Sequence, residues 1–347
     1  MVKIKRMHFS QLEKDWKKLT SENTNISPFH EYEFAKKLLK SYWIPQFLHY
    51  IPVWKEKPVF YAFYENEKVF LIAPLVLTFS RQGIYYKSFG ERFRIVYEDF
   101  IYSDSLQIEK LEYCLTMLKN KLGTIQLFFQ MPGTKLYDVL KKCGKQINSE
   151  IMCKIRLPET YEEYYHSLGG KMRSNICNIN NRLKNDGCST SLSVYYGNEM
   201  PDEEYKQFLS LYEQSLQRKN GVSRFKLKKD IVSFIIKFCH PYAITMNSIP
   251  SSFCACYKIN NEIAAAEGGY VDPLGQYLVV HRVAYNPKFQ RYDPGHMMHI
   301  NIIKYLIEET DFLVFDLSKG DEPYKFRLGA DSYYQYGFEI KIGEYNS

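Results

Sequence analysis

The stretch FDLSKGDEPYKFRLG, from Phe315 to Gly329, carries the pattern that decides the fold class of this chain. Its apolar start predicts a strand that ends at Asp316, Gly320 marks a turn, and a short helix over 321–328 follows. A strand that runs through a polar turn into a helix is the repeating unit of α/β folds. Such folds place their sites where polar residues gather at the carboxyl end of a strand.

Four polar residues of this stretch are candidates for chemistry. Asp316 and Asp321 are candidate general bases, or groups that orient an amine, and Tyr324 is a candidate proton donor to a leaving group. Lys325 could neutralise a phosphate or a developing oxyanion. A turn with Asp321 as the helix N-cap and an Asp–Lys ion pair explains the same residues equally well.

A second motif, YNPKFQRYDPGHMM, joins a predicted strand to a predicted helix between Tyr285 and Met298. Asp293 is a good N-cap, Pro294 suits the first helical turn, and Gly295 lets a ligand approach the backbone. The N–H groups and the dipole at such a helix start favour a phosphate or pyrophosphate. A well-capped helix without a ligand is the simpler interpretation of the motif taken alone.

A third motif, SLGGKMRSNICNINNRL, spans Ser167 to Leu183 and predicts a helix over 171–184. Arg173, Asn180 and Lys184 share a helix face beside the apolar stripe, where they could hold an anionic substrate. An ordinary solvated face is the alternative.

Three further residues stand out less clearly. His296 and His299 are one turn apart on the helix that begins at Pro294, but spacing places no further metal ligand beside them, so a structural role is the simpler interpretation. Glu267, in AAAEGGY, could be a base near a strand splay or a hairpin residue beside flexible glycines.

The predicted elements follow the same order twice. Ser10 corresponds to Asp202, Ser105 to Pro294, Ile125 to Phe312 and Tyr137 to Tyr324, each pair about 190 residues apart. This predicts a duplicated α/β unit with domains over 1–150 and 151–347. The expected helices cover 10–21, 29–41, 105–122, 134–142, 161–168, 171–184, 202–219, 227–239, 294–309 and 321–328, and the expected strands cover 46–53, 59–64, 68–77, 84–89, 100–102, 125–130, 150–157, 242–246, 253–259, 262–271, 276–285, 312–317 and 333–342.

Composition excludes several classes of protein. Hydrophobic residues make up 45% of 347, which is enough for sizeable cores and excludes disorder. The net charge of +7 forms no basic stripe, which argues against DNA binding, and eight cysteines without a CxxC pair argue against a zinc site. The start lacks a signal-peptide pattern, and the longest apolar run, 69–79, is too short to span a bilayer, so a cytoplasmic protein is expected.

The motifs KMRSNICNINNRL, YDPGHMM and DLSKGDEPYK, together with IAPLVL and YYKSFGERFRIVYEDFIY in the first half, resemble one family. It comprises the GNAT-fold acetyltransferases attached to bacterial exopolysaccharide and cellulose biosynthesis, also described as BioF2-like, and it is similar to the Fem aminoacyltransferases. The resemblance implies two tandem GNAT-like domains, each a mixed sheet flanked by helices. The first domain, which lacks the motifs, would be a degenerate scaffold that shapes the acceptor cleft.

The resemblance also implies where the substrates bind. The pantetheine arm of an acyl thioester would enter between splayed strands that end near Tyr285 and Asp316. Donor-binding residues would be Val283, Tyr285, Gln290, Pro294, Gly295 and His296, and acceptor-binding residues would be Lys171, Arg173 and Glu267.

The expected activity is transfer of an acyl group from acyl-CoA to an amine on a small anionic acceptor, such as a sugar nucleotide, without a metal. Asp293 departs from the family's phosphate loop, which has glycine there, and its carboxylate would compete with a phosphate for the same N–H groups. This departure and the net positive charge favour a Fem-like alternative with aminoacyl-tRNA as the donor. A non-catalytic binding protein of the same fold is the remaining alternative.

Overall fold

The structure is a computed structural model, and it describes residues 1–24, 27–43, 55–80, 83–219, 246–272 and 274–342. The chain forms two compact units, one of Met1–Ile151 with Tyr334–Ser347 and the other of Met152–Tyr333. The predicted helix over 227–239 and the predicted strand over 46–53 lie outside the described residues. So does the predicted strand over 242–246, except for Met246, which lies in a turn.

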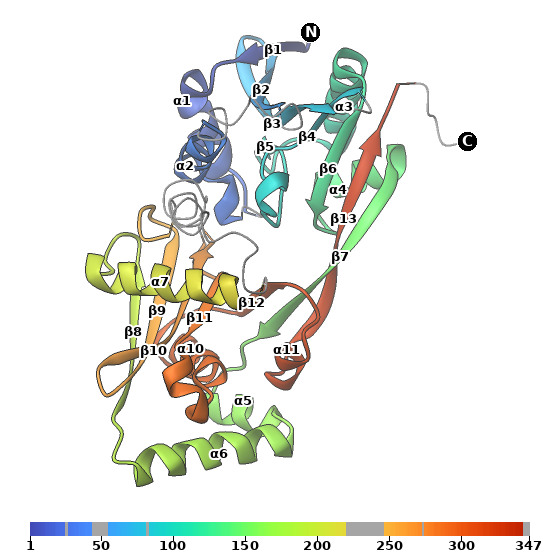
Figure 1. The fold of residues 1–347 in the computed structure, drawn as a ribbon. Coiled ribbons are helices and arrows are strands. Elements are labelled where there is room, and N and C mark those ends of the chain that lie inside the picture. Colours follow the sequence, from blue (N-terminus) through green and yellow to red (C-terminus); the bar gives the residue numbers. More distant parts are fainter. Residues whose placement is uncertain (25–26, 44–54, 81–82, 220–245, 273, 343–347) are drawn as a thin grey trace. The chain divides into compact units, whose positions relative to one another are not determined.

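The first unit contains a mixed sheet with helices on both faces (Figure 1). Its strands are β1 (Lys3–Met7), β2 (Lys55–Glu65), β3 (Lys68–Ser80), β4 (Gly83–Ser88), β5 (Ile101–Tyr102), β6 (Ile125–Gln130) and the first part of β7 (Lys145–Arg156). Its helices are α1 (Glu13–Ser21), α2 (Tyr32–Trp43), α3 (Ile108–Leu122) and α4 (Lys135–Cys143), with short 3-10 turns at Phe9–Leu12, Pro28–His30 and Glu91–Phe93.

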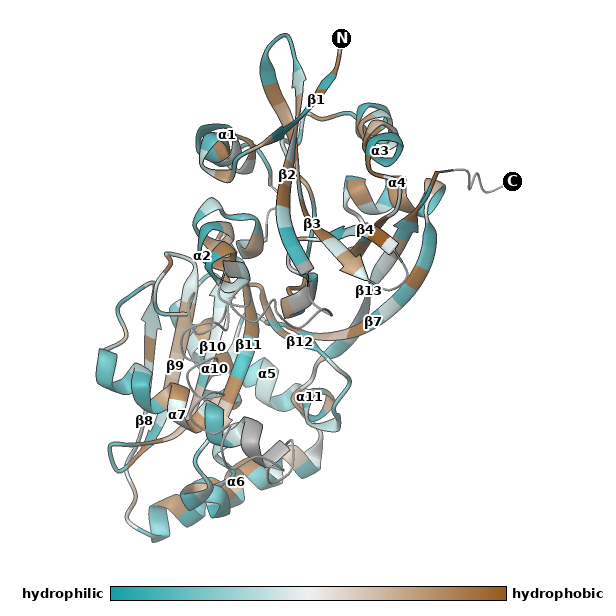
Figure 2. Ribbon diagram, turned by 45° about the horizontal axis from the view of Figure 1, so that its top comes forward, coloured by the Kyte–Doolittle hydropathy of each residue, from teal (hydrophilic) through white to brown (hydrophobic). Residues whose placement is uncertain are grey.

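Alternation along β2 divides the core of this unit. Phe60 packs against Trp16 of α1 at 6.2 Å between ring centroids, whereas its neighbour Tyr61 belongs to the cluster that contains Leu115 of α3 and Leu140 of α4. Successive strand residues point to opposite faces, so α1 covers one face and α3 and α4 cover the other. Figure 2 shows apolar residues concentrated along the strands of the sheet.

The second unit repeats this plan. Its strands are the end of β7, β8 (Thr190–Tyr196), β9 (Ser252–Ile259), β10 (Glu262–Val271), β11 (Tyr277–Tyr285), β12 (Val314–Lys319) and the start of β13 (Asp331–Ile340). Its helices are α5 (Tyr161–Ser167), α6 (Gly170–Asn185), α7 (Asp202–Lys219), α10 (Pro294–Glu309) and α11 (Pro323–Arg327), with a 3-10 turn at Pro287–Tyr292.

Two adjacent residues of β10 define the faces of this second sheet. A Cβ atom on Gly268 would lie 3.1 Å from Phe208 of α7, so this face is covered closely by α7. The preceding side chain, that of Glu267, points to the opposite face and lies against His299 of α10. Helices α7 and α10 therefore lie on opposite faces of the sheet (Figure 1).

Local sequence signals account for many element ends. The Thr160 side chain accepts a hydrogen bond from the Glu163 backbone N–H, so Thr160 caps the start of α5. Asn260 and Asn261 have φ of 51° and 64°, which is the left-handed pair that a tight β9–β10 hairpin requires. Gly187, at φ 63°, follows the end of α6.

The same order of elements occurs twice, which confirms the predicted duplication. The series β1, α1, β2, β3, β4, α3, β6, α4, β7 corresponds to β8, α7, β9, β10, β11, α10, β12, α11, β13. In each series the first four strands pair antiparallel, and the fourth pairs parallel with the fifth. Strands β1 and β8, the first of each repeat, were not predicted.

The last strand of each repeat completes the sheet of the other unit. Strand β13 pairs antiparallel with β6, with Ile340 opposite Ile125, and β7 pairs antiparallel with β12, with Phe315 opposite Ile155. The predicted second domain over 151–347 thus contributes residues 334–347 to the first unit.

Candidate active site

A β-bulge in β11 opens the second sheet. Gly268 of β10 lies opposite Arg282, but Gly269 lies opposite Val280, which leaves His281 as an extra residue in β11. A Cβ atom on Gly269 would overlap the carbonyl oxygen of Val279, so only glycine lets the two strands approach this closely. A bulge bends its strand and increases the local twist.

Strands β11 and β12 part where the bulge begins. Their parallel pairing covers Tyr277 to Val279 of β11 and ends at Asp316 of β12. Strand β11 then continues to Tyr285 with β10 as its partner, whereas β12 continues to Lys319 beside β7. The expected splay between the strands that end near Tyr285 and Asp316 is therefore present.

The bulge also decides which backbone groups face the splay. The backbone N–H of Asn286 donates to the carbonyl of Ala264 in β10 over 2.8 Å. Since N–H groups alternate in direction along an antiparallel strand, those of Val283 and Tyr285 point away from β10, towards the side that β12 has left. These are the two β11 residues that the resemblance assigns to the donor site.

The N-terminus of α10 carries no side-chain cap. Asp293 has a left-handed φ of 45°, and its carboxylate lies 2.8 Å from His296 Nδ1 and accepts a bond from Asn175 of α6. Burial raises the pKa of Asp293, but these bonds outweigh it and hold the pKa below its usual range. A Cβ atom on Gly295 would meet nothing within 4 Å.

The first backbone N–H groups of α10 are those of Gly295 and His296, which is where a helix binds an anion, and the His296 N–H also interacts with the Asp293 carboxylate. Asp293 makes no side-chain cap hydrogen bond, but the His296 backbone N–H helps to lower the pKa of its carboxylate. The predicted competition between Asp293 and a phosphate for the helix N–H groups therefore stays a prediction. Gln290 is exposed in the loop before α10, and Pro294 is buried at the start of the helix.

Two of the predicted catalytic residues, Asp316 and Lys325, instead form hydrogen bonds with the backbone at the end of β12. Asp316 is fully buried, and its carboxylate accepts 2.6 Å bonds from the Ser318 backbone N–H and the Tyr333 hydroxyl. Ser318 has a left-handed φ of 59°, so Asp316 stabilises an unusual backbone conformation.

Lys325 binds the same turn from the other side. Its ammonium, on a side chain only 2% exposed, donates to the carbonyls of Ser318, Lys319 and Gly320, the shortest bond being 2.6 Å, and lies 3.1 Å from Glu322. The structure thus gives Asp316 and Lys325 a use in the fold that differs from the expected base and oxyanion partner. Asp321 is exposed in the loop.

Tyr324 lies at the centre of a buried polar cluster. Its ring stacks on His299 of α10, with centroids 5.8 Å apart and planes 10° apart, and meets the His296 ring edge-on at 6.0 Å. His299 Nδ1 lies 2.8 Å from Glu267 Oε2. Burial raises the pKa of Tyr324, and the carboxylates of Glu322 and Glu267 and the thiol of Cys153 raise it further.

The structure brings together three residues that the sequence considered separately. Glu267 and Tyr324 were assigned to different roles, and His299 was given only a structural role. The available signal was the His296–His299 spacing, which places both rings on one face of α10.

The residues expected to bind the acceptor do not form one group. Lys171 is exposed at the start of α6, and Arg173 Nη1 lies 3.5 Å from His166 of α5. Glu267 is instead buried beneath α10. Helix α6 reaches the start of α10 through Asn175 rather than through Arg173.

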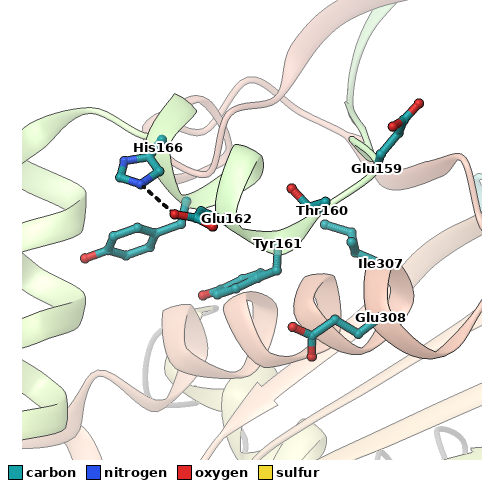
Figure 3. A pocket seen from close by; sticks show the side chains of 8 residues that line it. Glu159, Thr160, Tyr161, Glu162, His166, Ile307 and Glu308 are labelled. Atoms are coloured by element: carbon teal, nitrogen blue, oxygen red, sulfur yellow. Dashed lines mark ion pairs between the residues drawn. The ribbon is translucent and has the colours of Figure 1, made fainter.

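A pocket of about 700 Å³ lies between α5 and the C-terminal part of α10 (Figure 3). Its lining includes Glu159, Glu162 and Glu308, so it repels the phosphates of a CoA ester. Tyr324 and the α10 N-terminus lie at the other end of α10. This pocket is therefore not the candidate donor site.

Comparison with known proteins identifies the second half of the chain. Residues 171–326 match the family model described as an acetyltransferase (GNAT) domain. The stretch is a GNAT domain. It covers α6 through α11, and with it the bulge, the splay and Tyr324, and the chain that carries it is an acyltransferase.

Solved structures share the fold along nearly the whole chain. A structure titled FemX covers 97% of this chain and 97% of its own, with a TM-score of 0.61 at 13% identity. A conserved protein of unknown function from Bacteroides thetaiotaomicron VPI-5482 covers 98% and 99%, with a TM-score of 0.54 at 11% identity. No curated protein sequence matches the chain.

Two searches within the described residues gave negative results. No helix there is both long and apolar enough to cross a membrane. No group of three or more His, Cys, Asp or Glu side chains in those residues is placed to hold a metal ion.

Proposed function

We propose that this protein is an N-acyltransferase that takes an acyl group from acyl-CoA and transfers it to an amine. The observation that carries the proposal is the end of the β11–β12 pairing at Val279 and Asp316, beside the uncapped N-terminus of α10. A thioester with a long arm and a pyrophosphate needs a polar backbone edge and an anion site in this arrangement.

The donor would be held by backbone groups. The N–H groups of Gly295 and His296, at the positive end of the α10 dipole, would bind the pyrophosphate, with Gln290 at the rim. The open space at Gly295 leaves room for a phosphate to approach the backbone. The Val283 and Tyr285 N–H groups would hydrogen-bond the pantetheine arm and the thioester carbonyl.

The chemistry would be direct attack of the amine on the thioester. The Val283 N–H donates to the oxygen on which negative charge develops, which lowers the barrier because the donor is already in place. The C–S bond breaks as the C–N bond forms, Tyr324 passes its hydroxyl proton to the departing thiolate, and the amine loses its proton to solvent or a base.

We propose a sugar or sugar nucleotide of envelope or exopolysaccharide biosynthesis as the acceptor. Two observations support this choice: the basic residues Lys171 and Arg173 in α6, and the resemblance of KMRSNICNINNRL and DLSKGDEPYK to the acetyltransferases of those pathways. A basic helix favours an anionic acceptor such as a nucleotide diphosphate sugar.

Calorimetric titration with acetyl-CoA and with longer acyl-CoAs tests the donor site. The chain should bind at least one of them, and Gly295→Glu should abolish binding because its carboxylate lies where the pyrophosphate would. An acidic residue in the first turn favours the helix, so loss of folding would not explain the result. Gly295→Ala is the matched control and should retain binding. If no acyl-CoA binds the wild-type chain, the donor assignment fails.

The alternative is a Fem-like aminoacyltransferase that uses a charged tRNA. The net charge of +7 and the fold shared with the FemX structure favour it. Asp293 also favours it, because its carboxylate lies beside the His296 backbone N–H and would compete with a phosphate for that group. Binding of tRNA at low salt, where phosphate contacts are strongest, would support this alternative, provided that acetyl-CoA does not bind.

A further inference from the structure

Two imidazoles bracket the ring of Tyr324. His299 and His296 are one turn apart on α10, and they meet the phenol from its face and from its edge, with interplanar angles of 10° and 89°. Aromatic rings at these separations and angles attract one another, which restricts the rotation of the phenol. The contacts therefore determine where the Tyr324 ring lies.

Each imidazole has a carboxylate beside its Nδ1 atom. Glu267 Oε2 lies 2.8 Å from Nδ1 of His299, and Asp293 Oδ1 lies 2.8 Å from Nδ1 of His296. His296 and Asp293 form a hydrogen bond, which fixes the orientation of that ring, whereas His299 and Glu267 make a short ion-pair contact without hydrogen-bond geometry. Glu267 is fully buried and His299 is 3% exposed, so the inner pair is shielded from water.

The inner pair is unusual for a structural contact. Glu267 lies in the middle of β10, between Ala266 and Gly268, where an apolar side chain would pack without cost. Neither carboxylate oxygen of Glu267 has a hydrogen-bond donor of ideal geometry within the described residues, and the His299 imidazole is the group beside it. A buried carboxylate with so little compensation destabilises a fold, which indicates a functional reason for its presence.

The surroundings of Tyr324 complete the electrostatic picture. Besides burial, Glu322, which precedes α11, Glu267 of β10 and Cys153 of β7 act on the phenol electrostatically and raise its pKa, and His296 and His299 of α10 contact its ring. The negative charge of Glu267 disfavours loss of the phenol proton, and the imidazole of His299 lies in contact with both groups. The pair can thus influence both the position and the protonation of Tyr324.

We propose that Glu267 and His299 form a positioning pair for Tyr324: they orient its ring towards the departing thiolate and keep its hydroxyl protonated until that proton is transferred. This inference rests on the acyltransferase function proposed above. It replaces Asp316 and Asp321 as the acidic residue with the closest connection to the chemistry, because Asp316 is taken up by the turn and Asp321 is exposed.

Kinetics in two genetic backgrounds test the pair. His299→Phe keeps an aromatic ring but removes Nδ1, and Glu267→Gln removes the charge. Each should lower kcat about tenfold or more while the KM for the acyl donor stays unchanged. General acid catalysis contributes roughly 10²–10⁴-fold, and a misplaced acid should lose part of that contribution. In a Tyr324→Phe background neither change should lower kcat further. Glu262→Gln, on the same strand but exposed, is the control.

A purely structural role predicts a different pattern. The two substitutions would then reduce stability and raise KM, and their effects would add to that of Tyr324→Phe. That additive result would overturn the proposal. A double variant with the rate of either single variant would support it, since a pair that acts as a unit is not additive.

A substrate-free measurement separates this inference from the proposed function. Tyrosinate absorbance of the wild type and Tyr324→Phe, followed against pH, isolates the titration of Tyr324. Glu267→Gln removes a nearby negative charge and should lower the apparent pKa of Tyr324, whereas Glu262→Gln should leave it unchanged. An unchanged pKa in Glu267→Gln would overturn the pairing even if acyl-CoA binds. A lowered pKa together with no acyl-CoA binding would support the pair and sink only the donor assignment.

Discussion

At the scale of single residues, the hydroxyl of Tyr324 is the group that the proposed reaction needs most. Tyr324→Phe should lower kcat by about 100-fold or more, the usual contribution of a general acid, because the thiolate would leave unprotonated. The ring contacts with His296 and His299 stay, so donor affinity and unfolding free energy should change little. Steady-state kinetics with calorimetry checks this. The control is Tyr161→Phe in α5, whose ring lies beside Lys304 in the C-terminal part of α10. An unchanged kcat would remove Tyr324 from the mechanism.

Lys325 should matter for stability rather than for charge on the substrate. Lys325→Met removes the shared donor of three carbonyl oxygens, one buried and two partly buried, and a buried group left unsatisfied costs about 1–3 kcal/mol. We expect the free energy of unfolding in urea to fall by several kcal/mol. Lys184→Met on the exposed face of α6 should be neutral. A stable but inactive Lys325→Met would instead restore the catalytic role first expected from the sequence.

Asp99 of the first unit predicts a dependence of stability on pH. Burial raises the pKa of Asp99 from 3.8 to about 7, although Tyr102 and the Phe100 backbone donate hydrogen bonds to it. A carboxyl whose folded pKa is raised favours the folded state at low pH. Stability should therefore fall as the pH rises from about 4 to about 7. Asp99→Asn should flatten this dependence in urea unfolding measured across that range, and an unchanged slope would contradict the assignment.

At the scale of elements, the bulge in β11 depends on one glycine. Gly269→Ala would place a methyl group on the carbonyl oxygen of Val279, and the strands would have to move apart. We expect a loss of about 1–3 kcal/mol, typical of overpacking, and weaker acyl-CoA binding because the Val283 and Tyr285 N–H groups shift. Thermal unfolding and calorimetry check both effects, and Gly295→Ala, which meets nothing within 4 Å, should show neither. Equal behaviour of the two variants would rule out this role for the bulge.

Most elements could be predicted because their signals are local. The helix α7 and the strand β10 have the predicted bounds, since amphipathic periodicity and a hairpin pair of asparagines suffice. The edge strand β8 was missed because its residues are largely half-buried and the pattern is short. The partners of β7 and β13 were also missed, because a sequence pattern specifies a strand but not a distant strand that lies beside it.

The site was predictable only in part for the same reason. The stretch Phe315–Gly329 gathers polar residues in sequence, but Asp316 and Lys325 stabilise its turn. Glu267 and His299 meet although one lies in a strand and the other in a helix 32 residues later. Periodicity cannot show such a contact, since it depends on which face of β10 packs on α10.

At the scale of the whole molecule, the exchange of β7 and β13 makes each unit depend on the other repeat. A chain that ends at Ala330 lacks β13 and should leave the edge of β6 unpaired, although the missing strand belongs to the second repeat. Hydrogen exchange of the Ile125–Gln130 amides should then be faster, while a chain that ends at Ile342 should match the full chain. Unchanged protection of β6 would contradict the exchange.

A crystal structure of the complex with acetyl-CoA tests the central claim most directly. The account predicts the pyrophosphate on the N–H groups of Gly295 and His296, the thioester carbonyl on the Val283 N–H, and the sulfur next to Tyr324. A donor bound elsewhere, for example in the pocket between α5 and the end of α10, would contradict it.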